Sequence, residues 1–215
     1  MAFDVDDTLV RAVAAPDVGT NAKKFDPLPP DQASGCPRLV DSPGRAQVLV
    51  PHAAEVLDHL HSMGVTLALV SMGPEWQVRR LLAGFGVDHL FDWELGDYDR
   101  RDKAEKVQLV VEHYNDRLAA SVPFNREPPE PALRPDQVAF VDDNLSYLAR
   151  VDQAVPGVKL VWAHYATGDG LRELYRDLWE EHGTDLVPEW LEAPWRHQAP
   201  NRRPSHSKRT NAPKK

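Results

Sequence analysis

Several features are missing from this sequence, and each absence excludes a class of protein. Isoleucine is absent, which we interpret as the coding bias of a GC-rich genome. Cys36 is the single cysteine among 215 residues, so an internal disulfide is excluded, as expected in a reducing compartment. No apolar run approaches the roughly 20 residues of a membrane-spanning helix, and no charged segment followed by an apolar one indicates a secretory signal. We therefore expect a cytoplasmic protein without a membrane partner.

Most of the chain also lacks an excess of basic residues. The net charge is -8, and residues 193–215 contribute seven Lys or Arg and no Asp or Glu, which leaves -15 for residues 1–192. An acidic body argues against nucleic-acid binding. We expect the basic end to be a solvated, disordered tail, with contact to an anionic partner as the alternative.

Apolar runs of strand length alternate along the chain with segments of helical period. The expected strands are Met1–Val5, Val65–Val70, Val138–Val141 and Val158–Trp162, and the expected helices are His52–Met63, Pro74–Ala83, Lys103–Ala120, Leu145–Val151 and Gly170–Glu181. Two of the apolar runs, Leu67–Val70 and Val138–Val141, lack polar alternation, as strands buried on both faces do. The pattern predicts an α/β fold, a Rossmann-like three-layer sandwich with a central parallel sheet.

Two segments interrupt this alternation. Residues 11–50 contain no good helix, and Arg38–Val40 and Gln47–Val50 flank Asp41-Ser42-Pro43-Gly44, which predicts a β-hairpin. Residues 121–135 hold five prolines and are expected to form a loop. We expect one domain over residues 1–182, with an insert at 11–50, followed by an irregular tail at 183–215.

The first acidic group is Asp4-Val5-Asp6-Asp7-Thr8, directly after an expected strand. The two-residue period of a strand puts Asp4 and Asp6 on the same side, at the carboxyl edge where open α/β sheets bind ligands. Carboxylates this close repel each other unless a cation lies between them or one is protonated. A solvated acidic turn or a helix N-cap is the alternative. An EF-hand is excluded because the third loop ligand and the turn glycine are missing.

Three further groups follow later strand ends or begin a helix. Ser71 offers a hydroxyl and free backbone N–H groups for an anion, or an ordinary helix N-cap. Lys103 begins a helix and could neutralise a phosphate, with Lys106 as the competing candidate and a surface lysine as the alternative. Asp142 and Asp143 are hard oxygen ligands suited to Mg²⁺, or N-caps of the next helix.

The order of these groups is more specific than any of them alone. An acidic pair with Thr comes first, then Ser, then Lys, then the second acidic pair. A receiver domain of a two-component system combines similar residues, but its phosphorylated Asp lies in the middle of the chain. The order here therefore excludes a receiver domain.

In this order the residues resemble the haloacid-dehalogenase-type phosphohydrolase superfamily. Asp4–Thr8 matches its first motif, Leu67–Ser71 its second, Lys103 its third and Val141–Asp143 its fourth, over roughly residues 1–165. The chain looks most like the small magnesium-dependent phosphatase family, which lacks a cap domain. Those proteins carry a hairpin between the first two motifs, here Arg38–Val50.

The resemblance implies a Mg²⁺-dependent phosphomonoesterase acting on a small phosphorylated metabolite or a phosphoprotein. Asp4 would form an aspartyl-phosphate, and Asp6 would act as general acid and then as general base. The implied Mg²⁺ ligands are Asp4, the backbone carbonyl of Asp6, Asp142 and, directly or through water, Asp143. Ser71, the N–H of Met72 and Lys103 would hold the phosphoryl oxygens, with Thr8 and Asn144 in support.

Two other functions fit the same sequence. Some superfamily members load a three-carbon unit onto a carrier protein through a Cys in place of a catalytic Asp, and here Cys36 lies elsewhere in the chain. A non-catalytic module would use the phosphate site or the basic tail, although such proteins usually lose a motif residue. A phosphomutase is disfavoured because it normally needs a cap that closes out water, and no helical insert of that size is evident.

Overall fold

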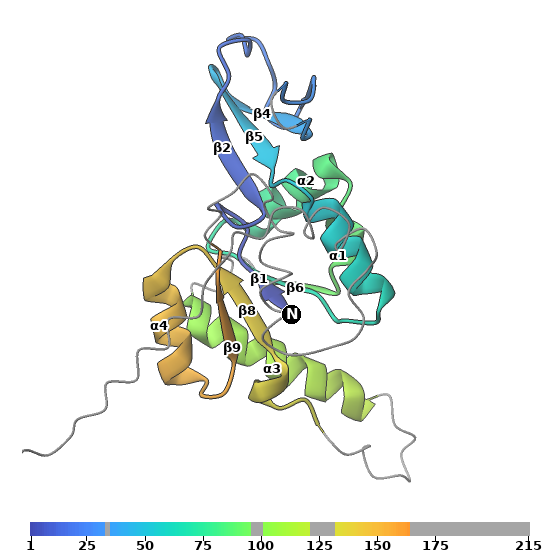
Figure 1. The fold of residues 1–215 in the computed structure, drawn as a ribbon, viewed down its shortest axis with the longest axis vertical. Coiled ribbons are helices and arrows are strands. Elements are labelled where there is room, and N and C mark those ends of the chain that lie inside the picture. The colour runs from blue at the N-terminus through green and yellow to red at the C-terminus, as the bar shows by residue number, and fades with distance from the viewer. Residues whose placement is uncertain (33–34, 96–100, 121–131, 164–215) are drawn as a thin grey trace, which may run out of the picture.

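Five parallel strands form the central sheet of the computed structural model, which describes residues 1–32, 35–95, 101–120 and 132–163 (Figure 1). The strands are β1 (Ala2–Phe3), β6 (Ala68–Val70), β7 (Trp93–Leu95), β8 (Ala139–Asp142) and β9 (Lys159–Trp162), in the spatial order β7-β6-β1-β8-β9. Each neighbouring pair is parallel. The strands β6 and β7 therefore lie on one side of β1, and the later strands β8 and β9 lie on the other. The expected parallel α/β sheet is confirmed.

Helices cover both faces of this sheet (Figure 1). The helices α1 (Ala53–Ser62) and α2 (Glu75–Phe85) share one apolar core, while α3 (Lys103–Ala120) and α4 (Leu145–Ala154) share another. Two short 3-10 helices, η1 (Asp88–Leu90) and η3 (Pro135–Gln137), precede β7 and β8. The arrangement is the three-layer sandwich that the alternating pattern predicts.

Strand residues alternate between the two cores. Phe3 and Leu69 belong to the core with α1 and α2, whereas Ala2 and Phe140 belong to the core with α3 and α4. All residues of β6 and β8 are buried. Burial on both faces explains why these strands are continuous apolar runs without polar alternation.

The segment between β1 and α1 forms a second, antiparallel sheet that rises from the body (Figure 1). Its strands are β2 (Val10–Ala14), β3 (Pro27–Leu28), β4 (Arg38–Ser42) and β5 (Arg45–Leu49), in the order β2-β5-β4-β3. The strands β4 and β5 form the expected hairpin. The sequence did not predict β2, whose partner β5 lies far along the chain, or β3, which is a short strand of two residues paired with β4.

The antiparallel sheet is attached to helix α2. Leu39 of β4 is buried in the same core as α1 and α2. Lys24 Nζ donates to Gln77 Oε1 at 3.3 Å, and the Arg80 guanidinium lies 5.7 Å from the centre of the Phe25 ring. The insert therefore packs against the body of the protein, in part through α2.

Several expected boundaries differ from the observed ones. The strand expected to reach Val5 ends at Phe3, because the chain beyond Asp4 enters a tight turn that is closed by hydrogen bonds to the carbonyl of Val5. The helix expected to end at Ala83 continues through Gly84 to Phe85 and closes at Gly86, which has a positive φ of 73°. No strand was expected where β7 forms. The helix expected at 170–181, most of the 121–135 loop and the tail at 183–215 lie outside the described residues.

None of the helices in the described ranges combines the length and apolar character that crossing a membrane requires.

The contact between α2 and the antiparallel sheet predicts a specific energetic coupling. A Cβ atom at Gly84 would lie 2.6 Å from Leu39 Cδ1. We expect the effect of Gly84→Ala on the free energy of unfolding to be less favourable in the native protein than in the Leu39→Ala variant, by about 1 kcal/mol or more. In the Leu39→Ala variant the overpacking disappears, whereas the higher helix propensity of Ala remains. Urea unfolding of the two single variants and the double variant measures this coupling.

A matched reference for this cycle is Met63→Ala. Met63 is exposed at the end of α1, so its substitution should change the free energy of unfolding by about 0.5 kcal/mol or less and should be additive with Gly84→Ala. Leu39→Ala alone should cost about 2–5 kcal/mol. Additivity between the Gly84 and Leu39 substitutions would show that the insert does not pack on α2 in this way.

Candidate active site

The predicted site residues converge at the carboxyl ends of β1 and β8. These two strands are neighbours, and the N–H of Asp4 donates to the carbonyl of Val141 at 2.9 Å, so that their pairing continues just past β1. From β1 the chain extends to β6 and β7 on one side and to β8 and β9 on the other. In open α/β sheets, ligands bind in the crevice at this change of direction.

A tight loop follows Asp4 and turns the chain back toward β2. The carbonyl of Val5 accepts hydrogen bonds from the N–H groups of Thr8, Leu9 and Val10 at 3.3, 2.9 and 3.0 Å. Asp7 adopts a positive φ of 57°, a conformation that Asp tolerates better than most residues. The loop buries the Thr8 side chain and leaves Asp6 exposed.

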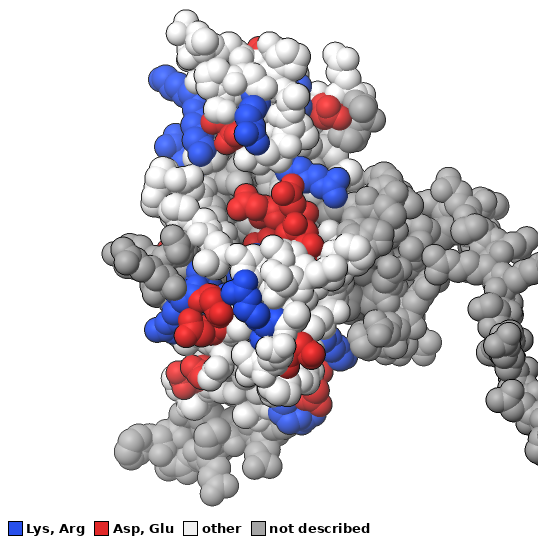
Figure 2. All heavy atoms as spheres, turned by 90° about the vertical axis from the view of Figure 1, so that its left-hand side faces the viewer, with Lys and Arg blue, Asp and Glu red and all other residues white. Residues whose placement is uncertain are grey.

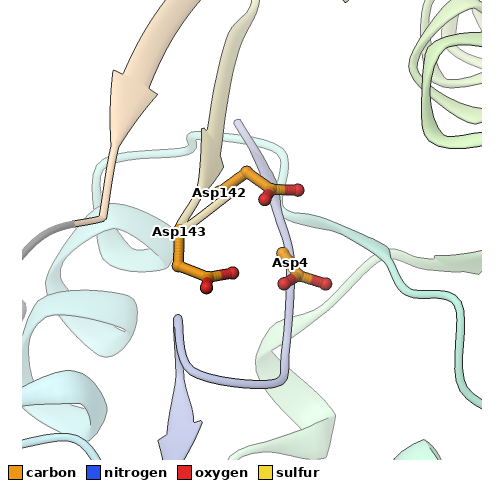
Figure 3. Close-up of side chains that lie close together, drawn as sticks. All are labelled: Asp4, Asp142 and Asp143. Atoms are coloured by element: carbon orange, nitrogen blue, oxygen red, sulfur yellow. The ribbon is translucent and has the colours of Figure 1, made fainter. Parts of the chain in front are cut away.

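Three carboxylates lie together at this edge of the sheet (Figure 3). Asp4, Asp142 and Asp143 each offer one oxygen, and these oxygens lie within 4.8 Å of one another. Asp4 and Asp142 are buried, with 4% and 0% of their surface exposed, and Asp143 is half-buried. Carboxylate oxygens at this spacing form the donor set that a hard divalent cation prefers.

The turn after β8 holds two of these carboxylates in place. Asp142 Oδ1 accepts the N–H of Asn144 at 2.8 Å, and the Asn144 side chain caps α4 by accepting the N–H of Ser146 at 2.9 Å. The indole N–H of Trp162, at the end of β9, donates to the carbonyl of Asp143 at 2.9 Å. Asn144 therefore takes the N-cap role that was the alternative explanation for Asp142 and Asp143.

Lys103 lies between two of the carboxylates. Its Nζ is 2.8 Å from Asp4 Oδ1 and 2.7 Å from Asp142 Oδ2, and 3% of the residue is exposed. A reciprocal capping box fixes the start of α3, since Asp102 accepts the N–H of Glu105 and Glu105 accepts the N–H of Asp102, both at 3.0 Å. The Lys103 ammonium therefore extends from the first turn of α3, whose start is fixed by this capping box.

The buried charges shift the pKa of both partners in this ion pair. Burial raises the pKa of Asp4 to about 7, although the Lys103 ammonium partly offsets that rise. Burial alone would lower the pKa of Lys103, but the charges and hydrogen bonds of Asp4 and Asp142 outweigh it and raise the pKa. Lys103 therefore remains an ammonium, while Asp4 can exchange a proton near neutral pH.

Two carboxyl groups nearer the solvent also have raised pKa values. Loss of hydration raises the pKa of Asp6, and the negative charge of Asp7 adds to this effect. Loss of hydration likewise raises the pKa of Asp143, followed by repulsion from Asp142. Figure 2 shows acidic side chains gathered where the antiparallel sheet meets the body of the protein. Such crowding is relieved either by protons or by a bound cation.

The loop after β6 contributes the remaining predicted group. Ser71 is buried, and its Oγ accepts the N–H of Gly73 at 3.0 Å, which leaves the hydroxyl proton to donate elsewhere. The N-cap of α2 is Pro74, so Ser71 is not the N-cap of that helix. Lys106 Nζ donates to the carbonyl oxygen of Ser71 at 2.8 Å.

The structure brings together most of the residues predicted from the sequence. Asp4, Lys103, Asp142 and Asp143 converge, and Ser71 follows the strand next to β1. The carboxylate of Asp6 is not part of the three-carboxylate cluster. The sequence reasoning missed the capping box at Asp102 and Glu105, although the Asp-x-x-Glu spacing before an apolar helix was a usable signal.

The two lysines in the first turns of α3, which the sequence left as competitors, have different partners. Lys103 contacts the carboxylates of Asp4 and Asp142, while Lys106 contacts the loop that begins at Ser71. Helical spacing alone could not separate them, because both lysines lie on the buried side of α3.

Solved structures with a similar arrangement include two from bacteria. One is the N-terminal, phosphatase-containing part of a Bacteroides fragilis protein, described as complexed with Mg, with 19% identity and a TM-score of 0.42, covering 57% of this chain and 28% of that one. Another is a predicted phosphoglycolate phosphatase from Haemophilus somnus, with 24% identity and a TM-score of 0.44, covering 55% of this chain and 46% of that one. This chain therefore spans less than half of the length of either protein. A search of curated protein sequences finds no match.

The family comparison is more decisive. A model of haloacid dehalogenase-like hydrolases matches residues 38–146, which is half of the chain. The matched region contains Ser71, Lys103, Asp142 and Asp143, and it begins after Asp4. This chain belongs to the haloacid dehalogenase-like hydrolases.

Proposed function

We propose that this protein is a Mg²⁺-dependent phosphomonoester hydrolase that forms an aspartyl-phosphate on Asp4. The observation that carries the proposal is the buried Asp4 carboxylate, which lies against the Lys103 ammonium and within reach of Asp142 and Asp143. This combination provides a nucleophile, a fixed cation and a second set of oxygen ligands at one edge of the sheet.

The residues at this edge fit a magnesium ion. Asp4, Asp142 and Asp143 supply the carboxylate oxygens, and the backbone carbonyl of Asp6 is the fourth proposed ligand. Burial raises the pKa of both Asp4 and Asp143, and the negative charge of Asp142 adds to the rise. Bound there, Mg²⁺ supplies the positive charge that lets an anionic nucleophile approach an anionic phosphate.

In the first half of the reaction, an ionised Asp4 oxygen bonds to phosphorus while the bond from phosphorus to the ester oxygen breaks. Asp6 transfers its proton to that departing oxygen and becomes a carboxylate. A raised pKa suits this role, because the group must be protonated when the bond breaks. Asp6 is exposed to solvent, so a leaving group can reach it.

In the second half, the same Asp6 carboxylate takes a proton from water, whose oxygen attacks the phosphorus of the aspartyl-phosphate. The bond between Asp4 and phosphorus breaks, inorganic phosphate leaves and the Asp4 carboxylate is restored. During both steps, Ser71, the Met72 N–H and Lys103 hold phosphoryl oxygens and stabilise their charge. Thr8, buried in the loop after Asp4, supports the position of that loop.

The proposed substrate is a small phosphorylated metabolite or a phosphoprotein. Similar structures include proteins described as phosphatases, one of them complexed with Mg. Cys36, which an acyl-loading relative would need as its acceptor, is buried beside the antiparallel sheet and is not among the three side chains of the acidic cluster. No observation favours that second function.

The role of Asp4 is tested with a panel of phosphomonoesters in the presence of Mg²⁺. We expect Asp4→Asn to reduce phosphate release by about 10³-fold or more, since a neutral amide is a far weaker nucleophile than a carboxylate. Asp58→Asn, an equivalent change at an exposed position of α1, is the matched control and should retain full activity. Equal activity of Asp4→Asn and the control would rule out the aspartyl-phosphate mechanism.

Asp6→Asn separates the general acid from the nucleophile. In this variant the rate of aspartyl-phosphate formation, measured as the initial burst of released alcohol, should fall about 10²- to 10⁴-fold with alkyl phosphates and much less with para-nitrophenyl phosphate, whose leaving group needs little protonation. The aspartyl-phosphate should also accumulate on Asp4, because its hydrolysis needs the same carboxylate, and mass spectrometry of a rapidly quenched digest would detect it. A rate loss independent of the leaving group would remove Asp6 from the acid role.

The raised pKa of Asp4 predicts that Mg²⁺ affinity depends on pH. A cation binds the ionised carboxylate, so at a pH below about 7 binding must release the proton from Asp4. We expect the affinity to rise by up to about tenfold per pH unit between pH 5.5 and 7 and to level off above that range. Titration calorimetry in two buffers of different ionisation enthalpy measures both the affinity and the proton released.

The control for this measurement is the Asp4→Asn protein. Its Mg²⁺ affinity should be weaker and its pH dependence smaller, with the remainder due to Asp143, whose pKa is also raised. A Mg²⁺ affinity of the native protein that is unchanged over this pH range would contradict the assignment of Asp4 as a buried ligand.

A further inference from the structure

Lys106 is a fully buried lysine that the proposed chemistry does not use. It has 0% of its surface exposed and is among the largest completely buried side chains of the protein. Its Nζ donates to the carbonyl oxygen of Ser71 at 2.8 Å and lies 3.9 Å from the sulfur of Met72. Removing an ammonium from water costs several kcal/mol, and an apolar side chain of similar length would fill this space without that cost.

The first turns of α3 send their two ammonium groups to different strand ends. Lys103 reaches the carboxylates of Asp4, just after β1, and of Asp142, at the end of β8, whereas Lys106 reaches the loop that follows β6. The backbone of Lys106 is tied to the capping box, since its N–H donates to the carbonyl of Asp102 at 3.1 Å. The Ser71 loop is therefore held by the same end of α3 that carries Lys103.

The bond from Lys106 orients the peptide unit between Ser71 and Met72. In a trans peptide the C=O and the following N–H point in opposite directions. Because the Ser71 carbonyl points to the buried Lys106, the N–H of Met72 points away from it. Within the described part of the chain, no hydrogen bond has the Met72 N–H as its donor.

The other side of this loop is held separately. The Ser71 hydroxyl oxygen accepts the N–H of Gly73 at 3.0 Å. A side chain at Gly73 would meet this oxygen and Val78 Cγ2, both at 3.4 Å, so the turn is closely packed. The two bonds leave the Met72 N–H and the Ser71 hydroxyl proton as the donors this turn can offer to a ligand.

We propose that Lys106 is a positioning residue, which fixes the Ser71–Met72 peptide so that the Met72 N–H donates to a phosphoryl oxygen. The inference rests on the proposed phosphohydrolase function and adds a residue to it. Lys106 acts through the backbone of this loop, by its contact with the Ser71 carbonyl. Its effect is to remove the need to reorient a peptide during the reaction, which is how a preorganised oxyanion site lowers the barrier.

The test uses Lys106→Met, which keeps an unbranched side chain and removes the ammonium. Orthovanadate with Mg²⁺ serves as the probe for the phosphoryl site, and Mg²⁺ alone serves as the probe for the carboxylates. We expect vanadate affinity and kcat for para-nitrophenyl phosphate to fall on the order of 100-fold, because the donor peptide is no longer held in place. The Mg²⁺ affinity should change less than about threefold, since the carboxylates keep Lys103.

Lys159→Met is the matched control, because Lys159 is exposed at the start of β9, at the opposite edge of the sheet. It removes the same charge and should leave vanadate and Mg²⁺ binding unchanged. A folded Lys106→Met protein that binds vanadate as tightly as the native one would overturn the proposal. An equal loss of vanadate and Mg²⁺ affinity would also overturn it, because Lys106 would then support the whole site instead of this peptide.

A measurement on the native protein covers the case in which Lys106→Met does not fold. In a ¹H–¹⁵N spectrum, saturation with vanadate and Mg²⁺ should move the amide proton of Met72 downfield, as a new hydrogen bond to an oxyanion does. An unchanged Met72 resonance in the saturated protein would overturn the inference while leaving the proposed function standing. A native protein that binds neither vanadate nor inorganic phosphate would overturn both.

Discussion

The site depends on the balance of charge around Lys103. Three carboxylates converge within 4.8 Å, and two of them are buried and share one ammonium at 2.7–2.8 Å. A buried carboxylate without a partner would be neutral or would destabilise the fold. One ammonium cannot neutralise three carboxylates, and burial raises the pKa of Asp4 to about 7 in spite of Lys103. The remaining negative charge is what makes this place receptive to a cation.

The topology of the sheet makes that convergence possible. The strands β1 and β8 are neighbours although well over a hundred residues separate them in the chain. Because the two strands are parallel, their carboxyl ends meet at the same edge. Asp4 directly follows β1, Asp142 is the last residue of β8, and Asp143 follows it. Helix α3 enters from the adjacent layer with its capped end at this edge. Each functional group thus comes from a rigid element that ends or begins there.

Short-range patterns predicted much of the site and of the fold. Continuous apolar runs identified β6 and β8, and the helical period identified α3 with the observed bounds. Non-local features were not predictable in this way. The strand β2 is recognised by its pairing with β5, and Gly84 has the character of a helix terminator but packs against Leu39 inside α2. Its place is decided by a contact between segments that are distant in the chain.

By itself, the sequence determined which chemical groups stand at the strand ends and in what order, because residue types and their spacing are properties of the chain alone. Tertiary structure alone decided which of them meet. It separated Lys103 from Lys106, since two residues one helical turn apart reach different strand ends, and it left the Asp6 carboxylate outside the three-carboxylate cluster. The physical reason is that proximity across a sheet depends on strand order and loop direction, whereas residue type and spacing record only what each segment offers.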